Sequence, residues 1–64
     1  MRITLKAARV NKGLTQKEAA VALNVAKETI GRWEKGASRP KLEQIEPLCA
    51  LYGVKYDDIT WNVN

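Results

Sequence analysis

The 64-residue chain contains no histidine and a single cysteine, Cys49. One cysteine excludes an internal disulfide, and without histidine no plausible set of zinc ligands remains. The sequence also lacks a glycine-rich phosphate loop and a nucleophile with an evident base beside it. We therefore expect no enzymatic activity, no cofactor, no metal and no small-molecule substrate.

Long apolar runs are also missing from the chain. No stretch approaches the roughly 20 apolar residues that a membrane-spanning helix needs. The first ten residues lack the apolar run of a signal peptide. This predicts a cytoplasmic protein with no membrane partner. With 45% hydrophobic residues, the chain suits one small domain, residues 1–64, whose limited core depends on helix packing.

Two short helices are predicted in the middle of the chain. Thr15 and Glu18 form a capping box, which predicts a helix over residues 16–23. Asn24 tolerates the left-handed backbone conformation that ends a helix and turns the chain sharply. A second helix follows over residues 27–35. Two helices joined by so tight a turn are typical of a helix-turn-helix, which points to DNA.

The second of these helices is amphipathic. Ile30 and Trp33 lie three residues apart and face inward with Val25. The residues predicted to lie on the opposite, exposed face are Lys27, Glu28, Gly31, Arg32 and Lys35. The predicted helix-turn-helix therefore covers residues 16–35, with a buried apolar side and a charged outer side.

Three further helical segments are predicted around this motif. Residues 5–11 form a helix that Thr4 caps, residues 41–52 form a longer helix, and a short helix covers residues 56–59. Pro47 removes a backbone hydrogen bond within the longer helix, so we expect a kink or a late start near it. The chain is thus predicted to be all-α, with four to five helices.

Charge is unevenly distributed along the chain. Residues 1–41 carry ten lysines and arginines against three glutamates, about +7, whereas residues 42–64 carry one lysine against four acidic residues, about −3. Such a distribution orients a protein on a polyanion, with the half that contains the motif toward the phosphates. The alternative is that the charges only solvate a small domain.

Several residues match a known pattern in order and spacing: Gln16, Ala20, Val25, Ile30 and the ending Trp33-Glu34-Lys35-Gly36. From about Leu5 to Ile59 the chain resembles the Cro- and repressor-type helix-turn-helix family, also called XRE-like. The resemblance implies a compact lambda repressor-like domain, similar to Cro proteins and repressors of phages and prophages. Its implied partner is double-stranded DNA at the nucleoid of a bacterial host.

The resemblance also implies which residues read bases. In this family the second helix of the motif lies in the major groove, so the candidates are Lys27, Glu28, Thr29 and Arg32. Arginine can bind guanine through two parallel hydrogen bonds, lysine through one, and glutamate can accept from a cytosine amino group. Gly31 would let the backbone approach the bases closely. Alternatively, Glu28 and Arg32 only pair with each other on an exposed helix face.

Phosphate contacts are expected from groups that flank this helix. Gln16 resembles the phosphate-binding glutamine of the family, and it stands at a helix N-terminus, where backbone amides favour an anion. The alternative for Gln16 is an ordinary solvated side chain. The other candidates for phosphate contacts are Lys17, Lys35, Ser38 and Arg39.

Two further features concern the fold. Arg9 and Glu34 stand where similar repressors have a partly buried ion pair, so we expect them to hold the first helix against the third. Ala26 stands where many relatives have serine or threonine. Because alanine cannot cap a helix, we expect the start of the recognition helix to fray until DNA binds.

A single short helix reads too few bases for useful selectivity, so we expect a homodimer on an inverted repeat. Its expected interface is Ile59, Trp61 and Val63, in a tail over residues 56–64. The alternative is a tail folded over the chain's own core.

These features favour a sequence-specific transcription regulator that occupies an inverted-repeat operator. The alternative hypothesis is an antitoxin-like protein-interaction module with secondary DNA binding, which the absence of long extensions disfavours. The operator sequence, the target genes and the choice between activation and repression stay open.

Overall fold

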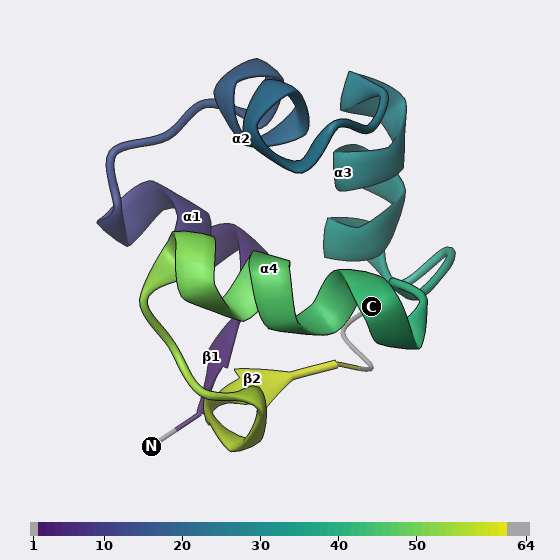
Figure 1. The fold of residues 1–64 in the computed structure, drawn as a ribbon. Coiled ribbons are helices and arrows are strands. Elements are labelled where there is room, and N and C mark those ends of the chain that lie inside the picture. The colour runs from purple at the N-terminus through teal and green to yellow at the C-terminus, as the bar shows by residue number, and fades with distance from the viewer. Residues whose placement is uncertain (1, 62–64) are drawn as a thin grey trace.

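A computed structural model describes residues 2–61 of the chain. Within this range it contains four α-helices: α1 (Leu5–Asn11), α2 (Gln16–Leu23), α3 (Lys27–Lys35) and α4 (Leu42–Tyr52) (Figure 1). A 3-10 turn, η1 (Tyr56–Asp58), follows α4, and two strands of two residues each, β1 (Ile3–Thr4) and β2 (Ile59–Thr60), flank the helices. The predicted all-α helix-turn-helix fold is confirmed. None of the helices in the described range is long and apolar enough to cross a membrane.

Local capping explains where the first helices begin and end. Thr4 Oγ1 accepts a hydrogen bond from the Ala7 N–H at 3.0 Å. Thr15 and Glu18 make both hydrogen bonds of the capping box, at 3.0 and 2.8 Å. Asn24 adopts the left-handed conformation, with φ 58° and ψ 45°. These signals act within a few residues, which is why the bounds of α1 and α2 match the prediction. The bounds of α3 match as well, although Ala26 provides no side-chain cap at its start.

Helix α4 departs from the prediction at its proline. It begins at Leu42 and continues through Pro47, so the late start expected near Pro47 is wrong. The Lys41 N–H donates to Gln44 Oε1 at 2.7 Å, which closes the first turn. Pro47 is exposed, as is Glu43, whose carbonyl the proline leaves without an N–H donor. Water can therefore hydrogen bond to that carbonyl, and the helix tolerates the proline.

The core lies where the four helices meet. Its largest fully buried side chains are Ile30, Leu48 and Ile59, and Trp33 is also buried, as predicted. Ala19 and Ala20 on α2 are buried as well, and such small side chains let α3 cross α2 closely. Figure 1 shows α2 and α3 on one side of α4, with the two strands on its other side.

No signal in the sequence predicts β1, and the alternation of Ile59 and Trp61 leaves open whether the tail forms a strand. The two strands pair in parallel, with Ile3 beside Ile59 and Thr4 beside Thr60, so the two ends of the described chain lie side by side. Ile59 is only 2% exposed, which corrects its assignment to a dimer interface. At Ile59 the tail packs into the chain's own core, which is the alternative to a dimer interface.

Trp61 continues the chain beyond β2 and is half-buried. Its indole Nε1 donates to the Tyr56 carbonyl at 3.2 Å, and the two rings stack with their centroids 5.2 Å apart. Trp61 therefore retains an accessible part that a partner chain can contact. Val63, the third residue predicted for the interface, lies outside the described residues.

Candidate nucleic-acid interface

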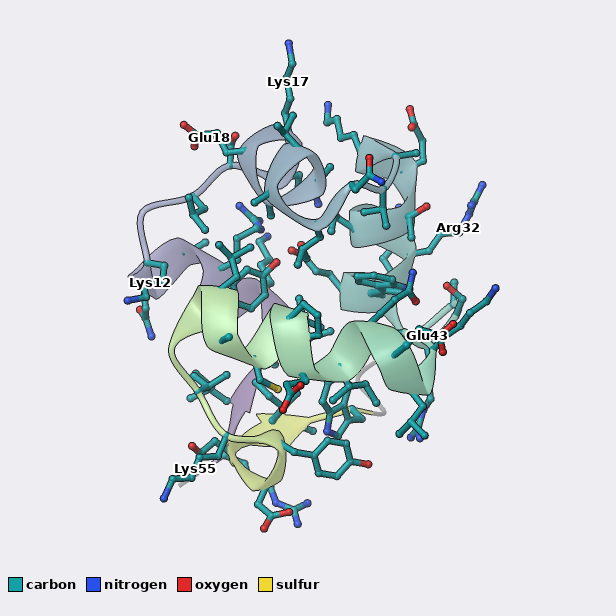
Figure 2. All side chains as sticks on the ribbon, viewed as in Figure 1. Lys12, Lys17, Glu18, Arg32, Glu43 and Lys55 are labelled. Atoms are coloured by element: carbon teal, nitrogen blue, oxygen red, sulfur yellow. The ribbon has the colours of Figure 1, made fainter. Side chains whose placement is uncertain are left out.

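The outer face of α3 and the start of α2 border a hollow of about 370 Å³. Its lining residues are Gln16, Lys27, Glu28, Gly31, Arg32 and Lys35. The hollow has this composition because Ile30 and Trp33 are buried on the inner side of α3, which directs the charged residues of that helix outward. Figure 2 shows Arg32 on α3 and Lys17 on α2 extending away from the body of the molecule.

The hollow gathers three of the four residues predicted to read bases. Lys27, Glu28 and Arg32 line it together and are exposed, whereas Thr29 is half-buried and is not part of the lining. Over the residues that the structure describes, Glu28 and Arg32 form no ion pair with each other. Their hydrogen-bonding groups therefore face solvent, where a ligand can bind them.

The residues predicted to contact phosphate are divided by the fold. Gln16 and Lys35 line the same hollow, and Lys17 is exposed beside it at the start of α2. Arg39 instead borders a second hollow of about 270 Å³, together with residues of the N-terminus and of the segment that follows α4. Ser38 is exposed in the loop that links α3 to α4.

A buried ion pair lies behind the first hollow. Arg9 Nε donates to Glu34 Oε2 at 2.6 Å, and Arg9 Nη2 donates to Glu34 Oε1 at 3.3 Å. Arg9 Nη1 also donates to the Leu14 carbonyl at 2.7 Å. The two side chains are 9% and 6% exposed. The hydrogen bonds to Glu34 raise the pKa of Arg9. The ion pair that the family resemblance implied is therefore present and holds α1 to α3 in its charged form.

The structure adds a contact that the sequence analysis missed. Gln16 Nε2 donates to Glu34 Oε1 at 3.1 Å, so Gln16 belongs both to the buried network and to the lining of the hollow. Gly31 lies next to it, because a Cβ atom on Gly31 would come within 3.8 Å of Gln16 Nε2. The contact joins α2 to α3 across 18 positions of sequence, and no local pattern links the two residues.

A third hollow, of about 470 Å³, runs along α4 and η1 on another part of the surface. It is mostly apolar, and its lining residues are Leu42, Ile45, Glu46, Cys49, Ala50, Val54 and Tyr56. Leu42 is 85% exposed and Tyr56 51% exposed. Cys49 is half-buried here, and burial raises the pKa of its thiol. Among residues 2–61 no three His, Cys, Asp or Glu side chains are placed to hold a metal ion.

The order of the helices, the tight turn between α2 and α3 and the charged outer face of α3 all agree with one family. Residues 5–59 match the family model described as helix-turn-helix. The chain belongs to the helix-turn-helix family. Domains of this family place the second helix of the helix-turn-helix motif, which corresponds to α3, in the major groove of DNA. They act by binding rather than by chemical catalysis.

Two known proteins are similar to this chain. The transcriptional repressor RstR of the cryptic phage CTXphi, from Vibrio cholerae, is 46% identical over 46 residues, which cover 72% of this chain and 41% of RstR. The HTH-type transcriptional activator BcrR of Enterococcus faecalis is 31% identical over 55 residues, which cover 86% of this chain and 27% of BcrR. The chain thus spans less than half of either relative. No solved structure matches the chain significantly.

Proposed function

We propose that this chain is a sequence-specific, double-stranded DNA-binding transcription regulator. The observation that carries the proposal is the hollow beside α3, where three cationic side chains and one carboxylate surround Gly31 on the exposed face of a recognition helix. Cations neutralise phosphates, whereas the mixture of donors and an acceptor suits base edges in the major groove. Such a regulator acts at the nucleoid, in the bacterial cytoplasm.

Each residue of this surface has a proposed role. Lys27, Glu28 and Arg32 read base edges, and Thr29 contacts a thymine methyl or a phosphate at the edge of the site. The residues proposed to bind phosphates are Gln16, Lys17, Lys35, Ser38 and Arg39. Arg39 borders a different hollow, so it can bind a phosphate only if the loop after α3 approaches the DNA backbone.

We further propose a phage or prophage repressor, similar to Cro proteins, that binds an inverted repeat as a homodimer. The similarity to a phage repressor supports the proposal that this chain is a phage or prophage repressor. The apolar hollow along α4 and η1 supports the proposed homodimer, because another copy of the chain can cover exposed side chains such as Leu42 and Tyr56. Of the two residues of the predicted interface that the structure describes, Trp61, which stacks on Tyr56 close to this hollow, is the accessible one.

The same apolar hollow supports a second candidate function. In an antitoxin-like module, a different protein would cover the surface along α4, and DNA binding would be secondary. The two candidates differ in what the isolated chain does. The regulator selects a DNA sequence by itself, whereas the module binds DNA weakly and without preference until its partner is present.

The test is selection from a random duplex pool at near-physiological salt, with excess competitor DNA and enough protein to populate a dimer. Enrichment of an inverted repeat is the expected result, and the repeat gives the half-site spacing directly. Arg32→Ala serves as the matched control, because it removes a proposed base contact from the exposed face without touching the core. Weak, salt-sensitive binding with no enriched sequence would favour the second candidate.

A further inference from the structure

We infer that Glu34 and Arg9 are positioning residues for DNA binding, because together they hold the Gln16 side chain in the orientation that presents it to a phosphate. The inference rests on the proposed function and extends it to residues that do not reach DNA. Glu34 and Arg9 are only 6% and 9% exposed, so neither side chain forms the DNA-facing surface.

The orientation of Gln16 follows from the chemistry of its partner. A carboxylate only accepts hydrogen bonds, so the amide group of Gln16 must turn its Nε2 toward Glu34 Oε1, the atom that lies 3.1 Å away. One N–H of Nε2 is used in this bond. The second N–H is left to donate at the edge of the hollow, where a phosphate oxygen can accept it.

Glu34 can act in this way because Arg9 restrains it. Oε2 of Glu34 is held by Arg9 Nε at 2.6 Å, while Oε1 is shared between Arg9 Nη2 and Gln16 Nε2. The guanidinium also neutralises a carboxylate that would otherwise repel phosphates beside the hollow. The network therefore connects α1, the end of α3 and the start of α2, with Gln16 as the only one of its three side chains that lines the DNA-facing hollow.

The consequence for binding is a side chain that is ordered before DNA arrives. A free glutamine loses rotamer freedom when it is immobilised, which weakens binding by about tenfold for a side chain of this length. Gln16 has already lost most of this freedom in the free protein. Its hydrogen bond to phosphate therefore gains affinity that a mobile glutamine at the same position would not supply.

A double-variant background tests the inference. Arg9→Met with Glu34→Met replaces the ion pair by unbranched apolar side chains, which avoids leaving one charge buried alone. On a duplex enriched from the random pool, we expect Gln16→Ala to weaken binding by about five- to tenfold in the native chain. In the double variant the same change should weaken binding less than about twofold, because Gln16 is no longer held. An equal factor in both backgrounds overturns the inference.

Lys17→Ala is the matched control for this comparison. Lys17 is adjacent to Gln16 in sequence and is exposed, with its side chain directed away from the body of the molecule in Figure 2. Its loss should therefore weaken binding by the same factor in both backgrounds. If the native chain enriches no sequence at all, the proposed function fails, and ¹⁵N relaxation of the free chain still tests the positioning of Gln16.

The second measurement uses the unmodified chain without DNA and does not depend on a variant that folds. ¹⁵N relaxation reports the order of the Gln16 side-chain amide, with exposed Asn11 at the end of α1 as the mobile reference. We expect an order parameter for Gln16 close to that of rigid backbone, about 0.85. A value below about 0.6, similar to Asn11, overturns the inference.

Discussion

At the scale of single residues, Gly31 shows how stability and binding can favour different side chains. Alanine at this position improves helix propensity by about 1 kcal/mol, and its Cβ would meet Gln16 Nε2 at 3.8 Å, an ordinary contact. We therefore expect Gly31→Ala to raise the free energy of unfolding in urea. We expect it also to weaken DNA binding, because the methyl group occupies space that the bases approach.

The control for this prediction is Ala50→Gly, an exposed position of α4 away from the hollow beside α3. Because Ala50 lines the apolar hollow along α4, where a second copy is proposed to bind, its effect on DNA binding is measured with a duplex that holds a single half-site. Ala50→Gly should lower the free energy of unfolding by a similar amount, about 1 kcal/mol, and leave the affinity of a single DNA-bound subunit unchanged. If Gly31→Ala binds the duplex enriched from the random pool as tightly as the native chain does, the bases do not approach this point.

Arg32 and Arg39 separate base reading from phosphate binding. Arg32→Ala should relax the preference at one base pair in each half-site by about 1–3 kcal/mol. Arg39→Ala should weaken binding to all sequences alike and reduce the slope of log K against log salt by about 1. Titrations of specific and random duplexes at several salt concentrations measure both effects. Equal losses on the two duplexes for Arg32→Ala would contradict its role at the bases.

At the scale of helices, α3 is the one whose start is least supported. Ala26 has the extended backbone of an N-cap, with φ −73° and ψ 150°, but it offers no side-chain hydrogen bond. Because the backbone is already suited to a cap, Ala26→Ser should raise the free energy of unfolding by about 1 kcal/mol. Urea denaturation followed by circular dichroism measures the change.

Thr15→Ala is the opposite control for that prediction, since it removes an N-cap that exists. The Thr15 hydroxyl accepts from the Glu18 N–H at 3.0 Å, and its loss should lower the free energy of unfolding by about 1 kcal/mol. If Ala26→Ser leaves stability unchanged while Thr15→Ala lowers it, the start of α3 is held by tertiary packing rather than limited by its missing cap.

The elements also show what a sequence can predict and what it cannot. The bounds of α1 and α2 depend on signals within four residues of their ends, such as the capping box at Thr15 and the left-handed Asn24, so they could be predicted. The effect of Pro47 could not, because tolerance of a proline depends on which side of α4 is exposed. The residues lining the hollow followed from the period of α3 and the resemblance, whereas the Gln16 to Glu34 bond depends on how α2 crosses α3.

At the scale of the whole molecule, the tail shows a similar limit. A run of alternating apolar residues indicates that one face is buried, but it does not say against which chain. The pairing of β1 with β2 places Ile59 in the chain's own core, and this pairing spans nearly the whole described sequence. Only the three-dimensional structure brings Ile3 and Ile59 together.

Global stability should depend on alkaline pH through Tyr52. This residue is 4% exposed, and burial, together with the charge of Glu34, raises the pKa of Tyr52 to about 12. Because the folded pKa lies above the unfolded value of about 10, the folded state favours the neutral phenol. The contribution of Tyr52 to the free energy of unfolding is therefore fully present below pH 10 and is lost as pH rises through 12. The loss is about 1–2 kcal/mol after allowance for solvent screening.

Urea denaturation between pH 8 and pH 12 measures this decline. Tyr52→Phe removes the ionisable group and keeps the ring, so the variant should lose the part of the decline that belongs to Tyr52. Lysine deprotonation affects both chains over the same range. Parallel curves for the two chains would show that Tyr52 is not the group responsible.

The parallel pair of β1 and β2 joins two ends that are 56 positions apart, counted from Ile3 to Ile59. Contacts between such distant positions have a high loop-closure entropy cost, and a pair of two-residue strands is among the parts most able to open by themselves. The chain contains two tryptophans whose emission can follow this event: Trp33 in the core and Trp61 beside the strands. The difference in emission between the native chain and Trp61→Phe belongs to Trp61. This difference should change at lower urea than the emission of Trp33, because this corner can open while α2 and α3 keep the hollow beside α3 in shape.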